Sequence, residues 1–188
     1  MLDYDLEAGR YDETRGGPAR ARAAADAVRG LVPGGTLLDV ACGTGLVTRE
    51  LARRGLRVLG VDAAAGMARL AAGRVDVVRG DGRALPVRDG CVDAVTTIWL
   101  LHLLDDARLV IAEAARVLRP GGVFVTTVDK RAAHGPGGRA EPADRSALVV
   151  EETARHGLRP SGESGFVGLG QGGAGPDPVF RLLAFRRA

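Results

Sequence analysis

Residues 37–51 read LLDVACGTGLVTREL, and this stretch decides the fold of the 188-residue chain. A short apolar run leads into the glycine-rich turn Gly43-Thr44-Gly45, and a segment with helical spacing follows it. Glycines in a strand-to-helix turn let the backbone approach a ligand closely, and the first amides of the helix face the same crevice. The stretch therefore predicts a strand, a tight turn and a helix that bind a nucleotide-like cofactor.

Composition narrows the class of protein. No apolar run reaches the roughly 20 residues of a membrane span, and the acidic start lacks the order of a secretion signal. We therefore expect a cytoplasmic protein without a membrane partner. The net charge is only +3, Lys130 is the only lysine and the arginines are scattered, so a nucleic-acid partner is not expected. Cys42 and Cys91 are too few for a disulfide framework and lack metal-ligand spacing, so we expect no metal.

Strands and helices alternate outward from the opening stretch. We expect strands at residues 36–40, 56–61, 75–79, 92–98 and 123–128. We expect helices at 46–54 and 63–72, and a third helix that Asp105 or Asp106 caps and that runs to Leu118. Further on, a helix at 146–156 precedes two strands at 163–169 and 179–186, which are joined by a loop too short for a crossover helix. The order of elements predicts right-handed βαβ units and an antiparallel last pair.

These elements predict an α/β fold, a Rossmann-like three-layer αβα sandwich. Its seven-stranded sheet is mostly parallel with the last strand antiparallel. We expect a single domain over residues 1–188. Within it, residues 1–32 form a flexible lead and a helix that starts near Pro18, residues 36–129 form the cofactor-binding core, and residues 130–188 add the C-terminal helix and the antiparallel pair.

Three acidic residues sit at or near the carboxyl ends of the first three expected strands, namely Asp39, Asp62 and Asp81. In an open α/β sheet the ligand lies outside those ends, so the three carboxylates can converge on one molecule. Asp62 follows Gly45 at close to the spacing at which an acid accepts hydrogen bonds from ribose hydroxyls. Asp81 would then lie near an adenine amino group, with the Gly82 amide beside the ring.

A dinucleotide-dependent oxidoreductase uses the same first turn and is the competing interpretation. The third glycine of its fingerprint would fall at Thr48, so that fingerprint is incomplete. Asp39 stands just before the turn, where a carboxylate would repel a pyrophosphate and would suit a cation. A positively charged ligand without phosphates fits better.

The residues resemble class I S-adenosylmethionine-dependent methyltransferases of the small-molecule type, with a core like that of ubiquinone and menaquinone methyltransferases. Four segments carry the resemblance in order: LLDVACGTG, VLGVD, GDGRALPVRDGCVDAV and EAARVLRPGGVFV. Ala63-Ala64-Ala65 departs from the Ser-Pro pair that relatives often have after the second segment, which removes a helix cap. The short segment after the fifth strand leaves little room for the cap that relatives insert over the acceptor.

The resemblance implies the cofactor S-adenosyl-L-methionine, with S-adenosyl-L-homocysteine as its product. Asp39, Gly43 and Gly45 would hold the methionine part. Tyr11 would close a lid over the cofactor, or would simply anchor the N-terminal segment. The full implied set for the cofactor is Tyr11, Asp39, Ala41, Gly43, Thr44, Gly45, Asp62, Ala63, Met67, Asp81, Gly82 and Thr97.

The acceptor side is less defined than the cofactor side. His102 follows the fourth strand, where relatives line the acceptor pocket, and it is expected either to act as general base or only to line the pocket. Trp99 could stack on an acceptor or pack in the core. The leading hypothesis is methyl transfer to an oxygen, nitrogen or carbon of a small molecule, in specialised metabolism, by a monomer or homodimer. The alternative is a protein that binds S-adenosylmethionine without methylating, as a regulator or a cofactor-assisted cyclase, and the dinucleotide oxidoreductase comes third.

Overall fold

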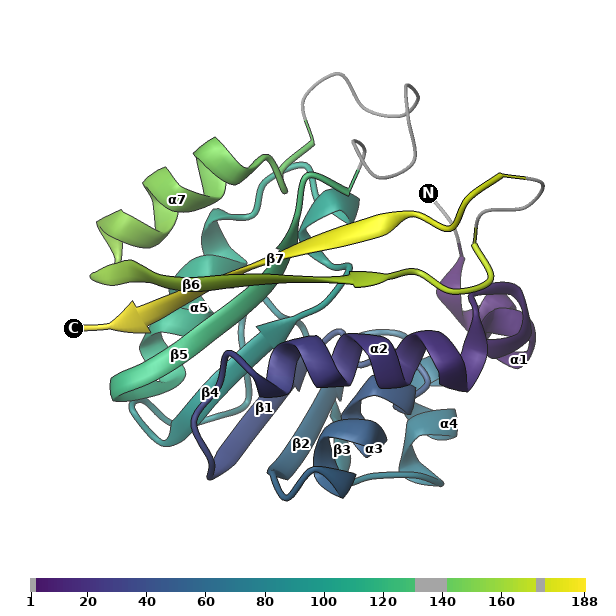
Figure 1. The fold of residues 1–188 in the computed structure, drawn as a ribbon. Helices are drawn as coiled ribbons and strands as arrows, with labels where there is room; N and C mark the ends of the chain where they lie inside the picture. Colours follow the sequence, from purple (N-terminus) through teal and green to yellow (C-terminus); the bar gives the residue numbers. More distant parts are fainter. Residues whose placement is uncertain (1–2, 131–141, 172–174) are drawn as a thin grey trace.

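A seven-stranded sheet is the centre of the computed structural model, which describes residues 3–130, 142–171 and 175–188 (Figure 1). The strands are β1 (Thr36–Val40), β2 (Arg57–Asp62), β3 (Val77–Arg79), β4 (Val92–Thr97), β5 (Leu118–Val128), β6 (Leu158–Val167) and β7 (Val179–Arg187). They lie in the order β3-β2-β1-β4-β5-β7-β6. The first five strands in this order pair with one another in parallel. Only β7 runs antiparallel to its neighbours β5 and β6, so the predicted sheet is confirmed.

Helices cover both faces of the sheet, which gives the three layers (Figure 1). The described helices are α1 (Tyr4–Thr14), α2 (Gly17–Arg29), α3 (Leu46–Arg53), α4 (Ala65–Ala72), α5 (Arg108–Val117) and α7 (Ser146–Arg155), and α1 packs on α4 and α2 instead of on the sheet. Successive residues of β1 point to opposite faces: Leu37 belongs to the core under α2 and α3, whereas Leu38 belongs to the core under α5 and α7. No helix within residues 3–130, 142–171 and 175–188 combines the length and apolar character needed to cross a membrane.

The N-terminal segment corrects one expectation, because the flexible lead is instead the helix α1. The Asp3 carboxylate caps this helix by accepting hydrogen bonds from the amides of Asp5 and Leu6. The Asp5 carboxylate accepts a hydrogen bond from the Gly66 amide at 2.6 Å, at the start of α4. Tertiary contacts therefore order a polar segment whose composition favours disorder. The next helix starts at Gly17, with Pro18 in its first turn as expected.

Two strands begin earlier than their sequence predicts. β5 starts at Leu118 and includes the Arg-Pro-Gly-Gly run that predicts a break, and the pairing of β4 with β5 shifts register between Val92 and Ala94. β6 starts at Leu158, and its pairing shifts between Pro160 and Gly162. Bulges tolerate proline and glycine within a strand, which explains why both runs resemble turns in the sequence. The third strand is shorter than expected, and parts of the expected loops, residues 131–141 and 172–174, lie outside the described residues.

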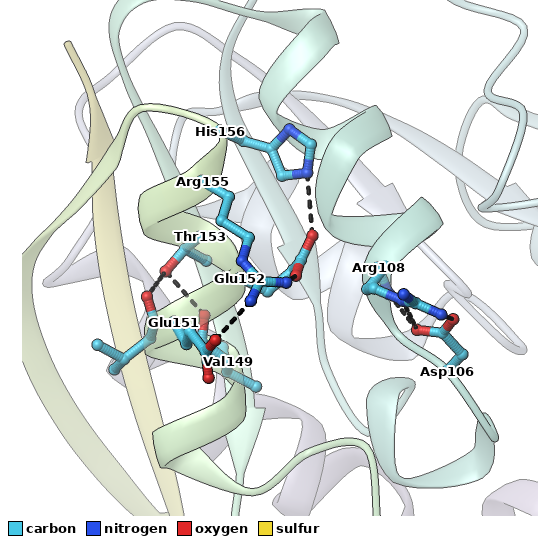
Figure 2. Close-up of polar contacts among 9 residues, drawn as sticks. Asp106, Arg108, Val149, Glu151, Glu152, Thr153, Arg155 and His156 are labelled. Atoms are coloured by element: carbon cyan, nitrogen blue, oxygen red, sulfur yellow. Dashed lines mark hydrogen bonds and ion pairs between the residues drawn. The ribbon is translucent and has the colours of Figure 1, made fainter.

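Charged pairs cover the surface where α7 lies beside the start of α5 (Figure 2). Arg155 binds the carboxylates of Glu151 and Glu152, and the His156 Nε2 atom lies 3.2 Å from Glu152. At the start of α5, the Asp106 carboxylate accepts a hydrogen bond from the amide of Arg108, which is the first helical residue. Ion pairs at the surface stabilise a fold only weakly, so we interpret this surface as an ordinary solvent-facing one.

Gly45 allows the glycine-rich turn to pack closely against α4. Its φ is +79°, a left-handed value that favours glycine. A Cβ atom here would lie 3.1 Å from the Ala71 Cβ and 3.3 Å from a Val75 methyl carbon. Gly55 has a similar φ of +84°, but a Cβ there would meet open space.

The Gly45→Ala variant should lower the free energy of unfolding by about 2 kcal/mol, because it adds both left-handed strain and crowding against α4. The matched variant Gly55→Ala should lose about 1 kcal/mol, since only the strain applies. Urea denaturation measures both. Equal losses in the two variants would contradict the close packing of the turn.

Candidate functional site

A cavity of about 400 Å³ lies at the carboxyl ends of the central strands, bordered by β1, β2, the segment after β4, and α1 and α2. Its volume falls in the range of small-molecule sites. Of the twelve residues assigned to the cofactor, ten line it: Tyr11, Asp39, Ala41, Gly43, Thr44, Asp62, Ala63, Met67, Asp81 and Gly82. Gly45 and Thr97 do not line it, and Thr97 is fully buried.

The end of β2 is fastened to the glycine-rich turn by Asp62. Its carboxylate accepts hydrogen bonds from the Gly43 amide at 2.8 Å and from the Ala64 amide at 2.9 Å. Burial raises the pKa of Asp62, and these two hydrogen bonds oppose that rise. Each carboxylate oxygen can accept more than one hydrogen bond, so a positioned carboxylate with acceptor capacity for a diol lines the cavity.

Gly43 has open space where a side chain would stand. Its φ is +58°, and a Cβ atom placed on it would meet no heavy atom within 4 Å. Because Gly43 also lines the cavity, a ligand can come directly against this backbone.

Asp39 is buried beneath the turn with both carboxylate oxygens occupied. Thr48 donates to one oxygen at 2.6 Å and Thr96 donates to the other at 2.7 Å. Burial raises the pKa of Asp39 to about 6, with the two hydroxyl bonds opposing the rise. Thr48, which stands where a dinucleotide fingerprint has its third glycine, therefore positions the carboxylate before the turn.

Asp81 lines the cavity but is held by its own loop. The Arg83 guanidinium and amide donate to its carboxylate, and these hydrogen bonds lower the pKa of Asp81. The pair is half exposed, so it can rearrange at little cost for a ligand amino group. At Gly82, a Cβ atom would lie 2.9 Å from a Val40 methyl carbon, so the loop passes too close to β1 for a side chain.

The helix α1 closes one side of the cavity. The Asp12 carboxylate accepts a hydrogen bond from the Thr44 hydroxyl and forms an ion pair with Arg74 at 2.8 Å. Tyr4 and Tyr11 both line the cavity from this helix, and burial raises the pKa of Tyr4 to about 12. Tyr4 and Asp12 are absent from the set expected from the sequence. The seven-residue spacing of Tyr4 and Tyr11 on one helix face is the signal that could have identified Tyr4.

His102 lies beside the cavity and does not line it. It belongs to a 3₁₀ helix, Leu101–Leu103, and its Nε2 atom is 2.7 Å from the Lys130 Nζ. Burial and the positive charges of Arg15 and Arg20 lower the pKa of Lys130 to about 8. The role of His102 as a base therefore stays a prediction.

Left-handed backbone marks three strand ends near this site. Ala41 after β1, Trp99 after β4 and Asp129 after β5 have φ values of 59°, 60° and 52°. Such conformations are costly for residues other than glycine, and they concentrate at functional sites. Asp129 accepts a hydrogen bond from the amide of Ser146 and so caps α7.

Trp99 packs in the core, as one of the two alternatives expects, and stacking on an acceptor stays a prediction. Its ring lines the cavity and also packs edge-on against Phe166 and Phe180, with centroid distances of 5.4 and 5.5 Å. The guanidinium carbon of Arg20 lies 4.1 Å from its ring centroid. Arg20 comes from α2 and lines the cavity, and no sequence motif points to it. Within the described ranges, no group of three His, Cys, Asp or Glu side chains is placed to hold a metal ion.

Comparison with known proteins gives one consistent picture. Residues 38–126 match a family model described as a methyltransferase domain. The chain is similar to a demethylmenaquinone methyltransferase of Renibacterium salmoninarum, with 37% identity over 142 residues. That alignment covers 71% of this chain and 60% of the relative, so the chain spans less than two thirds of the relative's length.

Solved structures agree on the fold. A methyltransferase from Thermotoga maritima, described as a possible histamine N-methyltransferase, superposes with a TM-score of 0.76 at 18% identity and 98% coverage of both chains. A geranyl diphosphate C-methyltransferase from Streptomyces coelicolor, solved with S-adenosyl-L-homocysteine, gives a TM-score of 0.70 at 19% identity, with 88% of this chain and 77% of that chain covered. At this identity the likeness establishes the Rossmann-like fold.

The contact of α1 with the glycine-rich turn is directly testable. In Asp12→Ala, backbone amides of α1 should exchange with deuterium about 10-fold faster, because the charged hydrogen bonds to Thr44 and Arg74 are lost. Glu13→Ala, which changes an exposed neighbour, should leave the exchange as in the unmodified protein. Identical exchange in the two variants would show that Asp12 does not hold α1 on the turn.

Proposed function

We propose that the chain is a class I S-adenosylmethionine-dependent methyltransferase that transfers a methyl group from S-adenosyl-L-methionine to an oxygen, nitrogen or carbon of a small molecule. S-Adenosyl-L-homocysteine is the product. The observation that carries the proposal is the meeting of Asp62, the Gly43 turn and the Asp81 loop around one cavity. The printed name of the Renibacterium relative makes a demethylated quinone one acceptor to test.

The cavity's chemistry fits this cofactor. The Asp62 carboxylate would accept hydrogen bonds from the ribose hydroxyls, and the Asp81 loop with Gly82 would face the adenine. The open space at Gly43 admits the backbone approach that the rest of the cofactor needs. Asp39, fixed by two hydroxyls, supplies a negative charge under the site of a cationic ligand.

Catalysis would depend chiefly on alignment. When bound, the cofactor supplies an electrophilic methyl on a sulfonium. Holding an acceptor in line with such a group can supply about 7 to 11 kcal/mol in ideal cases. Tyr4 and Tyr11 on α1 would exclude water from the cavity, and Trp99 would orient the acceptor.

Proton removal from the acceptor would fall to His102 together with Lys130. A lysine whose pKa is lowered to about 8 can be neutral near physiological pH, and its amine then lies within hydrogen-bond distance of the imidazole. This pair would accept a proton next to the apolar wall of Leu103 and Leu104. We further propose a cytoplasmic monomer or homodimer that acts without nucleic acid or membrane. The free thiols Cys42 and Cys91 support a reducing compartment.

Isothermal titration with S-adenosyl-L-methionine and S-adenosyl-L-homocysteine tests the cofactor. Both should bind, and Asp62→Asn should weaken binding about 10-fold to 100-fold because a charged acceptor is lost. The amide oxygen of asparagine can still accept from Gly43, so the turn is kept. Asp89→Asn, at an exposed site paired with Arg116, is the matched control and should bind as the unmodified protein does. Absence of binding, or equal affinity in both variants, would refute the assignment.

Methyl transfer separates the proposal from a protein that binds the cofactor without methylating. Tritiated S-adenosyl-L-methionine should label a component of a panel of metabolites that includes demethylated quinones. Cofactor binding without any labelled product would instead support the non-methylating alternative.

The base assignment is tested on the labelled acceptor. His102→Gln should lower kcat about 10²-fold, with the affinity for S-adenosyl-L-homocysteine unchanged, and should flatten the pH profile of kcat near neutrality. His156→Gln, on the distant end of α7, is the control and should keep both. An unchanged rate and pH profile in His102→Gln would mean that the imidazole only supports the pocket wall.

A further inference from the structure

Arg20 is a buried cation inside the cavity wall. Its side chain projects from α2, the residue is 8% exposed, and it lines the cavity beside Tyr11 and Trp99. Within residues 3–130, 142–171 and 175–188, no carboxylate forms an ion pair with it. The Tyr11 hydroxyl forms a hydrogen bond with the guanidinium, and Asp12, which is already bound to Arg74 and Thr44, exerts a smaller attraction, so no carboxylate neutralises the charge. Charges are seldom buried without a partner, so this position calls for an explanation.

Two hydrogen-bond donors in this wall lack acceptors. The Nε atom of Arg20 and the indole Nε1 of Trp99 are both buried, and neither has a hydrogen-bond partner among the described residues. Both groups are donors only, so the missing component is an acceptor oxygen. Unsatisfied buried groups are rare in folded proteins and often mark the place of an absent ligand or ion.

Aromatic rings hold the guanidinium without neutralising it. Arg20 stacks over Trp99 at 4.1 Å and lies 6.0 Å from the Tyr11 ring centroid. Ring faces attract a cation and leave the N–H groups at its edge available. The Trp99 ring is itself fixed by Phe166 and Phe180, so the donors are preorganised.

Further positive charge gathers on the same side. The charge of Arg15 acts on Arg20, and the charges of Arg15 and Arg20 both act on Lys130. Asp39 and Asp62 also line the cavity, at the ends of β1 and β2. The cavity wall therefore carries buried carboxylates as well as the buried cation of α2.

We propose that Arg20 and the Trp99 indole form a subsite for an anionic group, a carboxylate by preference, on the ligand that occupies the cavity. The planar guanidinium matches the two oxygens of a carboxylate, and the indole supplies a further donor. The proposal rests on the proposed function. The carboxylate can belong either to the amino-acid end of the cofactor or to an acidic methyl acceptor.

The first experiment distinguishes the sources on the cofactor side. S-Adenosyl-L-homocysteine and 5′-methylthioadenosine, which lacks the amino-acid end, are titrated into the unmodified protein, Arg20→Gln, Arg20→Lys and the exposed control Arg22→Gln. If the cofactor supplies the anion, Arg20→Gln weakens S-adenosyl-L-homocysteine about 10-fold to 100-fold, leaves 5′-methylthioadenosine unchanged, and Arg20→Lys falls between. Thermal melts by circular dichroism establish that each variant is folded, and Arg20→Lys keeps the charge if Arg20→Gln does not fold.

The second arm uses Trp99, the only tryptophan of the chain, as a fluorescent reporter. Benzoate is titrated with and without saturating S-adenosyl-L-homocysteine. If the acceptor supplies the anion, benzoate changes the fluorescence of the saturated protein and of Arg22→Gln but not of Arg20→Gln. The subsite is refuted if Arg20→Gln behaves as Arg22→Gln does in both arms. If the unmodified protein binds neither nucleoside, the proposed function fails, while the benzoate arm without nucleoside still tests the subsite.

Discussion

The hydrogen bond from the Gly43 amide to the Asp62 carboxylate joins the turn after β1 to the end of β2, and the cavity is arranged around that junction. It places a carboxylate against a backbone that has no side chain in the way. Other contacts secure the turn from below and from the side. Asp39, held by Thr48 and Thr96, lies under it. Asp12 holds α1 against Thr44, so separate elements of the fold meet at one short loop.

Local signals make the cofactor side predictable from the sequence. Apolar strands, glycine turns and strand-end acids act within a few residues of one another, and parallel strands bring their carboxyl ends to the same edge. For this reason the sequence alone predicts that Asp39, Asp62 and Asp81 lie together, and all three line the cavity. The parallel sheet and its antiparallel strand follow from the alternation of elements and the length of the last loop.

Other features depend on contacts between distant segments and give no local signal. The helix α1 is ordered by the bonds of Asp5 with Gly66 and of Asp12 with Thr44, which join residues 61 and 32 positions apart. In the sequence, nothing distinguishes Arg20 from the other arginines of its alanine-rich helix. Its contact with Trp99 arises only in the folded chain. The early starts of β5 and β6 escape prediction because their bulged starts contain the proline and glycine that normally mark turns.

Opposite charges line one cavity, and we propose that this cavity holds a cationic nucleoside. A crystal structure with S-adenosyl-L-methionine, whose sulfonium carries the positive charge, tests this proposal most directly. We predict the ribose hydroxyls on Asp62 and the adenine beside Asp81 and Gly82, with the backbone of Gly43 in contact with the ligand. A ligand bound outside this cavity, or one with its ribose away from Asp62, would contradict the proposal.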